Sequence, residues 1–188
     1  MIRAFIAVEI DQPNKEKLLK LVSDLKKSNA DVKWVTENQM HLTLKFLGNI
    51  EEGHVEQISG ALKSIADNFN AFSINLTRVG AFPDLKRPRV IWIGIDKGAG
   101  ELKTLGAKIE TELEKLGFAK EKREFKAHLT LGRVRSLKNI ENLEKIINEV
   151  KFQAGNEIKI DKIILFQSKL TPKGAIYTNL SEHPINDL

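Results

Sequence analysis

The sequence of 188 residues predicts an α+β fold in which two related αβ lobes present antiparallel sheets to a central cleft. Two observations predict this class. Short strand patterns alternate with amphipathic helix patterns, and no low-complexity segment or Pro/Gly-rich linker interrupts them. The tetrapeptide HLTL occurs at 41–44 and again at 128–131, each time between two predicted helices. Because there are only two copies, we expect one bilobal domain over 1–188 and not a stacked repeat array.

The first half begins with a strand pattern, RAFIAVEI at 3–10, whose residues alternate between two faces. Leucine and valine then recur at helical spacing over 14–27. A short strand at 32–35 precedes a strand through the first HLTL. A helix is expected to follow at 51–68.

The second half repeats this order of elements. Strands are expected at 71–79 and 89–95, the latter rich in β-branched and aromatic residues. A helix over 101–116 follows, with Gly117 as its stop signal. After the second HLTL we expect one more helix and then two strands; these three elements are predicted at 141–150, 157–166 and 174–180.

Composition bounds the environment of the protein. The chain has no cysteine, which excludes disulfides, thiolate metal ligands and a cysteine nucleophile. No apolar run approaches the roughly 20 residues that a membrane span needs, and the N-terminal pattern lacks a signal-peptide cleavage site. The formal net charge of +5 favours a polyanionic partner, although lysine-rich segments are also typical of solvated surface. We therefore expect a cytoplasmic monomer that does not insert into membranes.

The two HLTL tetrads have the composition of an acid–base site. Side chains two residues apart in a strand share a face, so His41 and Thr43 lie together, as do His128 and Thr130. Packing the two lobes around an approximate two-fold axis would bring these faces together. One imidazole can then accept a proton while the other donates one, and the hydroxyls can bind phosphate oxygens. This equipment suits in-line displacement at phosphorus without a metal.

Other interpretations of the tetrads are weaker. A single His-x-Thr usually reflects packing, but two identical copies at equivalent places are hard to attribute to packing. A metal site would need more than one ligand from each motif, and no third histidine or carboxylate stands at ligand spacing. We expect the remaining histidines, His54 and His183, to lie on the surface.

The paired motifs resemble those of the two-histidine (2H) phosphoesterase superfamily. Within it, the resemblance is to the RNA 2′,3′-cyclic phosphodiesterase branch, historically called 2′-5′ RNA ligases. It extends over essentially the whole chain and rests on the segments HLTLKFLG, HLTLGRV, FIAVEI, PRVIWIGI and LFQSKLTPKGAIY.

The resemblance implies a bilobal fold with a V-shaped cleft, one motif in each lobe, and hydrolysis of a 2′,3′-cyclic phosphate to a 2′-phosphate without a cofactor. His41 would donate a proton to the leaving 3′ oxygen, and His128 would accept a proton from water. Thr43 and Thr130 would bind the phosphate. The alternative is a 2′-5′ RNA ligase, in which a 5′-hydroxyl end replaces water and the same histidines act. An RNA-binding module without catalysis is disfavoured because both tetrads are intact.

The repeat also indicates two substrate-binding residues. Phe46 and Arg133 stand five residues after the respective histidines, and an aromatic ring and a guanidinium are surfaces on which nucleobases stack. Phe46 could instead belong to the core, and Arg133 could hold phosphate or pair with a surface carboxylate. The segment DLKRPRVIW at 84–92 predicts a basic loop before a strand, in which we expect Trp92 to pack in the core.

Overall fold

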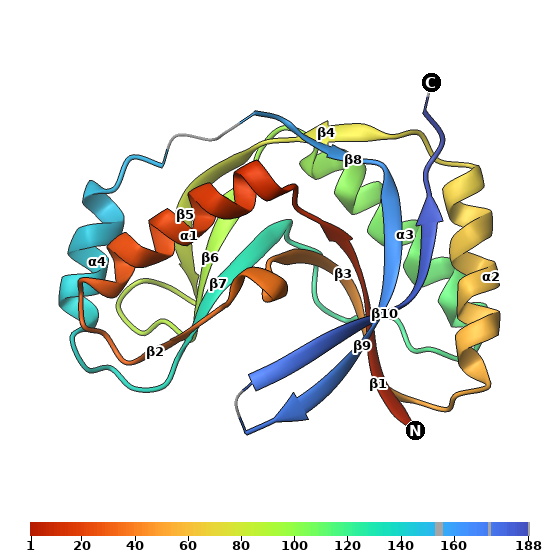
Figure 1. The fold of residues 1–188 in the computed structure, drawn as a ribbon, viewed down its shortest axis with the longest axis horizontal. Coiled ribbons are helices and arrows are strands. Elements are labelled where there is room, and N and C mark those ends of the chain that lie inside the picture. The colour runs from red at the N-terminus through yellow and green to blue at the C-terminus, as the bar shows by residue number, and fades with distance from the viewer. Residues whose placement is uncertain (153–155, 173, 188) are drawn as a thin grey trace.

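The computed structural model describes residues 1–152, 156–172 and 174–187. Within these ranges the chain forms two four-stranded antiparallel sheets, a two-stranded sheet and four α-helices. Figure 1 shows helices α1 and α4 on one side of the molecule and helices α2 and α3 on the other. The α+β class and the antiparallel sheets predicted from the sequence are confirmed.

The first lobe is built on the sheet with strand order β10-β9-β1-β3. Its strands are β1 (Ile2–Glu9), β3 (His41–Ile50), β9 (Lys162–Thr171) and β10 (Gly174–Pro184). Two helices cover this sheet, α2 (His54–Asp67) and α3 (Ala99–Lys115). Helix α2 packs against β9 and β10, and α3 packs against β3 and α2. The buried faces of these elements form part of one continuous apolar core.

The second lobe is built on the sheet with strand order β2-β7-β6-β5. Its strands are β2 (Val32–Trp34), β5 (Leu76–Phe82), β6 (Val90–Ile95) and β7 (His128–Val134), and a 3₁₀ turn, η1 (Glu37–Gln39), follows β2. Its helices are α1 (Gln12–Lys26) and α4 (Ile140–Glu149), which pack against each other. Figure 1 shows both helices on the side of this sheet.

The two halves of the chain exchange elements between the lobes. Strands β9 and β10 come from the end of the chain but lie in the same sheet as β1, whereas β2 comes from the first half and lies beside β7. Strands β4 (Phe72–Ile74) and β8 (Ile158–Ile160) form the two-stranded sheet. Neither lobe is therefore a contiguous segment, and each lobe needs residues from both halves of the chain.

Helix α1 begins earlier than the hydrophobic periodicity predicts. The Asp11 side chain accepts a hydrogen bond from the main-chain N–H of Asn14 at 3.0 Å, and Pro13 lies in the first turn. An aspartate cap followed by proline is a strong start signal for a helix. The first turn from Gln12 is thus set by capping and not by apolar spacing.

Two predicted strands are each divided in the structure. The segment expected as one strand at 71–79 breaks at Asn75, whose N–H donates to the Lys97 carbonyl at 3.2 Å. The segment expected at 157–166 breaks at Asp161, whose carbonyl accepts from the Ile185 N–H at 2.7 Å. At both breaks the main chain leaves the two-stranded sheet and enters a larger one, so the hydrogen-bonding partner changes.

A β-bulge interrupts β3 at the last residue of the first HLTL. Successive residues of β1 pair with Lys45 and with Thr43, so Leu44 is an extra residue. An extra residue shifts the alternation of faces by one position. Phe46 therefore lies on the same face as Thr43, whereas unbroken alternation would direct it into the core.

Strand β7 has the equivalent bulge. Successive residues of β6 pair with Gly132 and with Thr130, so Leu131 is extra and Arg133 shares the face of Thr130. Over the seven residues that begin at each histidine, the order of half-buried, buried and exposed positions is identical in the two strands. The sequence repeat is therefore also a repeat of backbone geometry.

The position after each bulged leucine points into the interior and is occupied differently in the two lobes. Lys45 is buried, and its Nζ donates to Glu110 Oε2 at 2.5 Å and to the Ala119 carbonyl at 2.9 Å. The equivalent Gly132 has no room for a side chain, because a Cβ there would stand 2.6 Å from Val32 Cγ1. One lobe thus uses a buried ion pair where the other uses a glycine.

Glu110→Ala should lower the free energy of unfolding by about 3 kcal/mol, because it leaves the Lys45 ammonium buried without its carboxylate partner. Denaturant unfolding followed by tryptophan fluorescence measures this change. The double variant Lys45→Met/Glu110→Leu should recover most of the loss, since both charges leave the interior. Lys63→Ala removes the exposed Lys63–Asp67 pair and should change stability by less than about 0.5 kcal/mol. A Glu110→Ala variant as stable as the wild type would contradict this account.

Candidate active site

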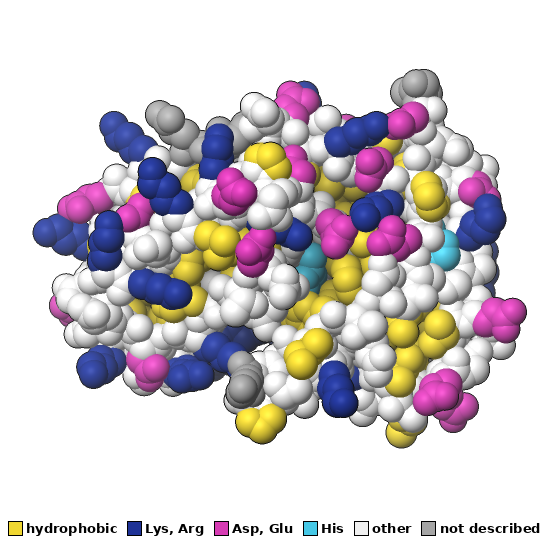
Figure 2. Space-filling model, in the orientation of Figure 1, with side chains coloured by type: hydrophobic (Ala, Val, Ile, Leu, Met, Phe, Trp, Pro, Cys, Tyr) yellow, Lys and Arg dark blue, Asp and Glu magenta, His cyan; other side chains and the backbone are white. Residues whose placement is uncertain are grey.

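Each HLTL places its histidine and threonine on one face of a sheet and its leucines in the core. His41 and Thr43 are half-buried on β3, and His128 and Thr130 are half-buried on β7. These strands belong to different sheets, yet they are in contact and lie near each other in Figure 1. Figure 2 shows apolar side chains at the surface over this junction. The fold thus brings together the two strands that contain the tetrads.

His41 lies among aromatic rings of the first lobe. Its ring stacks on Phe5 with centroids 4.8 Å apart, lies edge to face with Tyr177 at 5.1 Å, and is tilted against Phe166 at 5.9 Å. Burial lowers the pKa of His41 to about 4; the positive charge of Lys15 adds to this effect and Glu9 opposes it. His41 is therefore neutral near pH 7 in the unliganded protein.

His128 is oriented by the main chain of the second lobe. Its Nδ1 lies 2.6 Å from the Lys126 carbonyl oxygen, and since a carbonyl only accepts, Nδ1 carries the hydrogen. In the neutral ring, Nε2 then has a free lone pair. Burial lowers the pKa of His128, the hydrogen bond to Lys126 opposes this change, and the charge of Arg133 adds to it. The ring also meets Phe82 edge to face, with centroids 5.1 Å apart.

Phe46 and Arg133 are exposed on the faces that contain the histidines. The Phe46 side chain is 64% exposed, and its ring centroid lies 6.2 Å from that of Phe5. Burial raises the pKa of the Tyr177 hydroxyl, while the charges of Arg133 and Arg3 oppose the rise. Arg133 on β7 is therefore close enough to act on Tyr177 on β10, which belongs to the other sheet.

Trp92 does not pack in the core as expected from the sequence. It pairs with Thr130 across β6 and β7 and is half-buried on the face of the histidines, while Ile91 and Ile93 on either side are fully buried. Its indole contacts the backbone of Gly80, where a Cβ would clash with the ring. Its Nε1 has no hydrogen-bond partner among the described residues. In a strand, Trp92 must face the opposite side from Ile91 and Ile93, and this alternation was the sequence signal for its position.

The expectation that His54 and His183 lie on the surface is wrong for His183. Strand β10 extends to Pro184, and His183 pairs with Ile163 inside the first sheet. Its side chain is only 8% exposed, and its Nε2 lies 2.9 Å from Ser181 Oγ. His54 is half-buried at the start of α2, edge to face with Phe118.

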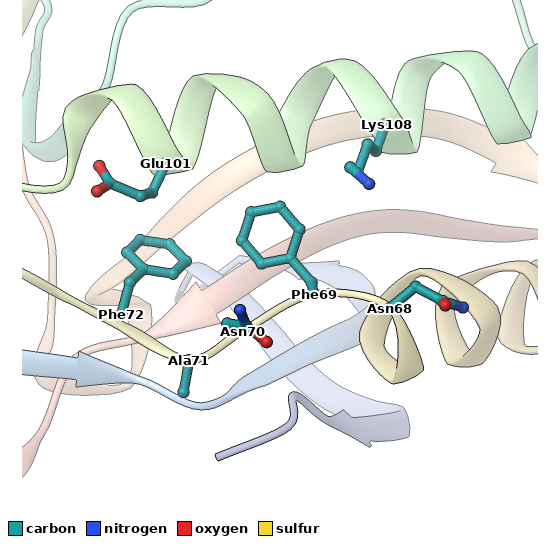
Figure 3. Close-up of a pocket in the computed structure, with 7 residues that line it drawn as sticks. All are labelled: Asn68, Phe69, Asn70, Ala71, Phe72, Glu101 and Lys108. Atoms are coloured by element: carbon teal, nitrogen blue, oxygen red, sulfur yellow. The ribbon is translucent and has the colours of Figure 1, made fainter. Parts of the chain in front are cut away.

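A separate hollow of about 420 Å³ lies between the end of α2 and one side of α3. In Figure 3, Phe69 and Phe72 point from the segment after α2 toward Glu101 and Lys108 on α3. The Lys108 Nζ lies 5.8 Å from the centre of the Phe69 ring. None of the six site residues predicted from the sequence lines this hollow.

Two further properties concern the described part of the chain. No group of three or more His, Asp or Glu side chains there is placed to hold a metal ion. Within the same ranges, every helix is too short or too polar to traverse a bilayer.

Comparison with known proteins agrees with the duplicated architecture. The model of the family described as "LigT like Phosphoesterase" matches the chain twice, over residues 8–92 and 93–177. A protein of Archaeoglobus fulgidus named RNA 2′,3′-cyclic phosphodiesterase is 39% identical over 95% of this chain and 98% of its own length. Proteins of the same name from Aeropyrum pernix and Methanothermobacter thermautotrophicus are 36% and 31% identical, over 88% and 95% of this chain and 93% and 96% of their own lengths.

Solved structures share the fold at lower sequence identity. A Thermus thermophilus protein superimposes with a TM-score of 0.82 at 24% identity, covering 98% of both chains. Escherichia coli LigT complexed with 3′-AMP superimposes with a TM-score of 0.78 at 21% identity, also covering 98% of both chains. The two family matches together span most of the sequence, and each contains one HLTL tetrad. This chain belongs to the family of LigT-like phosphoesterases.

Proposed function

We propose that this protein is an RNA 2′,3′-cyclic phosphodiesterase that hydrolyses 2′,3′-cyclic phosphate ends to 2′-phosphates. The observation that carries the proposal is that β3 and β7, which contact each other although they belong to different sheets, each have a histidine and a threonine on one strand face, His41 with Thr43 and His128 with Thr130. The names of relatives that match nearly the whole chain support the same substrate.

In this proposal His128 is the general base. Because its Nδ1 hydrogen is engaged by the Lys126 carbonyl, the Nε2 lone pair is the one that can take a proton. His128 Nε2 removes a proton from water as the water oxygen attacks phosphorus. The new P–O bond forms in line with the P–O3′ bond that breaks, and the hydrogen bond to Lys126 stabilises the imidazolium that results.

His41 is the general acid that protonates the leaving 3′ oxygen. The free protein holds this imidazole neutral, because the aromatic rings around it exclude water. A phosphate anion bound next to His41 favours the imidazolium, as any adjacent opposite charge does. The substrate therefore helps to charge the acid that acts on it. The bound 2′-phosphate remains after the 3′-hydroxyl has formed.

The remaining residues bind the substrate. Thr43 and Thr130 donate hydrogen bonds to the non-bridging phosphate oxygens, on which negative charge concentrates in the transition state. Phe46 and Arg133 lie on the same two faces, and both are exposed, so both surfaces are available to a nucleobase. We propose that they sandwich the terminal base.

His41→Ala and His128→Ala should each slow hydrolysis of a 2′,3′-cyclic phosphate oligonucleotide on the order of 10²–10⁴-fold, because each removes a proton carrier. Thr43→Ala and Thr130→Ala should cost about 10- to 100-fold, because each removes one hydrogen bond to a charged group. Rates are measured in EDTA, with the product isomer identified by chromatography.

The matched control is His54→Ala, which removes a histidine from α2 and should keep the wild-type rate. A 3′-phosphate product, loss of activity on chelation, or an active His41→Ala/His128→Ala double variant would each overturn the mechanism. A 2′-5′ linked product, formed when a 5′-hydroxyl RNA is added, would instead support the ligase alternative.

The pKa of His41 should rise when phosphate binds. By NMR, the His41 ring of the free protein should titrate near pH 4, since burial disfavours its charged form. Saturation with 2′-AMP should raise this pKa by about one unit or more, because the phosphate stabilises the imidazolium. The pH profile of kcat/KM should be bell-shaped, because the reaction requires a protonated His41 and a neutral His128. An unchanged His41 titration would contradict substrate-assisted protonation.

Phe46→Ala should weaken binding of a cyclic nucleotide by about 1–3 kcal/mol, similarly for all four bases, because each base has a face that stacks. Arg133→Lys should also weaken it, since an ammonium neither stacks nor forms a planar fork. Affinity for an abasic cyclic ribose phosphate should be unchanged in both variants. Ile176→Ala, which removes another exposed apolar side chain, is the control. If Arg133→Lys weakens binding of both ligands equally, Arg133 contacts the phosphate and not the base. If Phe46→Ala does not selectively weaken binding of the cyclic nucleotide, the sandwich is excluded.

A further inference from the structure

In the part of the chain that the structure describes, the arginines do not form ion pairs with carboxylates. Among the described residues, lysines make every ion pair within 4 Å, and none of the arginines makes one. Several of the lysine pairs are exposed pairs on the helices, such as Lys63 with Asp67 and Lys115 with Glu112. Arginine is the better ligand for phosphate, because its planar fork donates two parallel hydrogen bonds.

Several of these arginines gather at one edge of the second lobe, where β7 ends. Arg133 pairs directly with Lys33 across β7 and β2, and both side chains are exposed. Arg135 lies just after the end of β7, two residues beyond Arg133, and its N–H donates to the Asp31 carbonyl at 2.8 Å. Like charges directly opposite each other on a sheet are destabilising. The direct pairing of Lys33 with Arg133 therefore favours an anionic partner at this edge.

The loop between β5 and β6 adds further positive charge beside the end of β7. The end of this loop lies beside the end of β7, because the Arg89 carbonyl accepts a hydrogen bond from the Val134 N–H at 3.0 Å. Asp84 Oδ1 accepts from the N–H groups of Lys86 and Arg87, each at 2.9 Å. The one acidic residue of this loop is therefore engaged by main chain, while the side chains of Lys86, Arg87 and Arg89 are exposed.

These residues form a surface that leads away from the histidines, which we name the exit surface: Lys33, Lys86, Arg87, Arg89 and Arg135. At about 3.3 Å per strand residue, Arg135 stands roughly 20 Å beyond His128 along β7. Figure 2 shows Lys and Arg side chains along the lower edge of the second lobe, where Figure 1 draws β2. A single nucleotide held between the histidines does not reach so far.

We propose that the exit surface binds the phosphodiester backbone of the RNA strand on the 5′ side of its cyclic end. The inference rests on the proposed function for the position of that end, between β3 and β7. Arg133 stands between the catalytic faces and the exit surface, and the next phosphates of the strand then meet Arg135, Lys33 and the loop. The protein would thereby favour oligonucleotides over mononucleotides without reading their sequence, since backbone contacts carry no base information.

The test compares a 2′,3′-cyclic mononucleotide with an RNA of about ten nucleotides that ends in the same group, a length within the range of single-strand binding sites. The exit variant is Lys86→Ala/Arg87→Ala/Arg135→Ala. Its control is Lys63→Ala/Lys103→Ala/Lys115→Ala, which removes the same charge from the helices of the first lobe. For each protein, kcat/KM is measured at salt concentrations from about 50 to 300 mM.

We expect the wild type and the control to prefer the oligonucleotide, with kcat/KM falling steeply as salt rises. The exit variant should lose about tenfold or more on the oligonucleotide at low salt, and its log–log salt slope should be shallower by about two, at about 0.7 per phosphate contact. Activity on the mononucleotide should be unchanged. If the exit variant and the control respond alike on the oligonucleotide, the exit surface does not bind RNA, while the proposed function stands.

Binding is also measured without hydrolysis, by fluorescence anisotropy of a labelled oligonucleotide that ends in a 2′-phosphate. Weaker binding by the exit variant, and not by the control, supports the exit surface even if no protein hydrolyses either substrate, an outcome that would reject the proposed function alone. Arg135→Gln and Arg87→Gln are measured singly, so that a folding defect in the triple variant does not decide the result. Equal affinities for all proteins would reject the exit surface.

Discussion

The equivalent bulges in β3 and β7 are the constraint on which the candidate site depends. Each inserts one leucine, so that the residue five places after the histidine returns to the face of the histidine and threonine. Without the extra residue, Phe46 and Arg133 would point into the core. The bulge also directs the residue just before Phe46 or Arg133 into the interior. In β3 this residue is Lys45, which is buried with a carboxylate partner, and in β7 it is Gly132, which has no side chain.

Both imidazoles are partly desolvated by neighbouring aromatic rings. Rings from three strands of the first sheet surround His41, and Phe82 covers His128, so burial lowers both pKa values. A neutral site costs less to bury than a charged one. In the proposed mechanism, binding of an anionic substrate favours protonation of His41, and Arg133 provides fixed positive charge nearby.

The distribution of charge over the molecule separates two uses of basic residues. Lysines pair with carboxylates, mostly on the outer helices and loops, and add little net field there. Among the described residues, the arginines beside β7 have no carboxylate partner. In the loop that follows β5, the Asp84 carboxylate accepts hydrogen bonds from main-chain N–H groups. The net charge of +5 thus understates the positive field at one edge of the second lobe.

The sequence by itself determined the α+β class, the duplication, most helices and strands, and the faces of the two tetrads, because periodicity and repeats are local properties. The alternation of Ile91, Trp92 and Ile93 along the strand also indicated that Trp92 faces away from the core. Only the tertiary structure decided the bulges, the division of strands at Asn75 and Asp161, and the exchange of strands between lobes. These features depend on pairing between segments far apart in the chain, and a strand's own residues do not specify its partner's register.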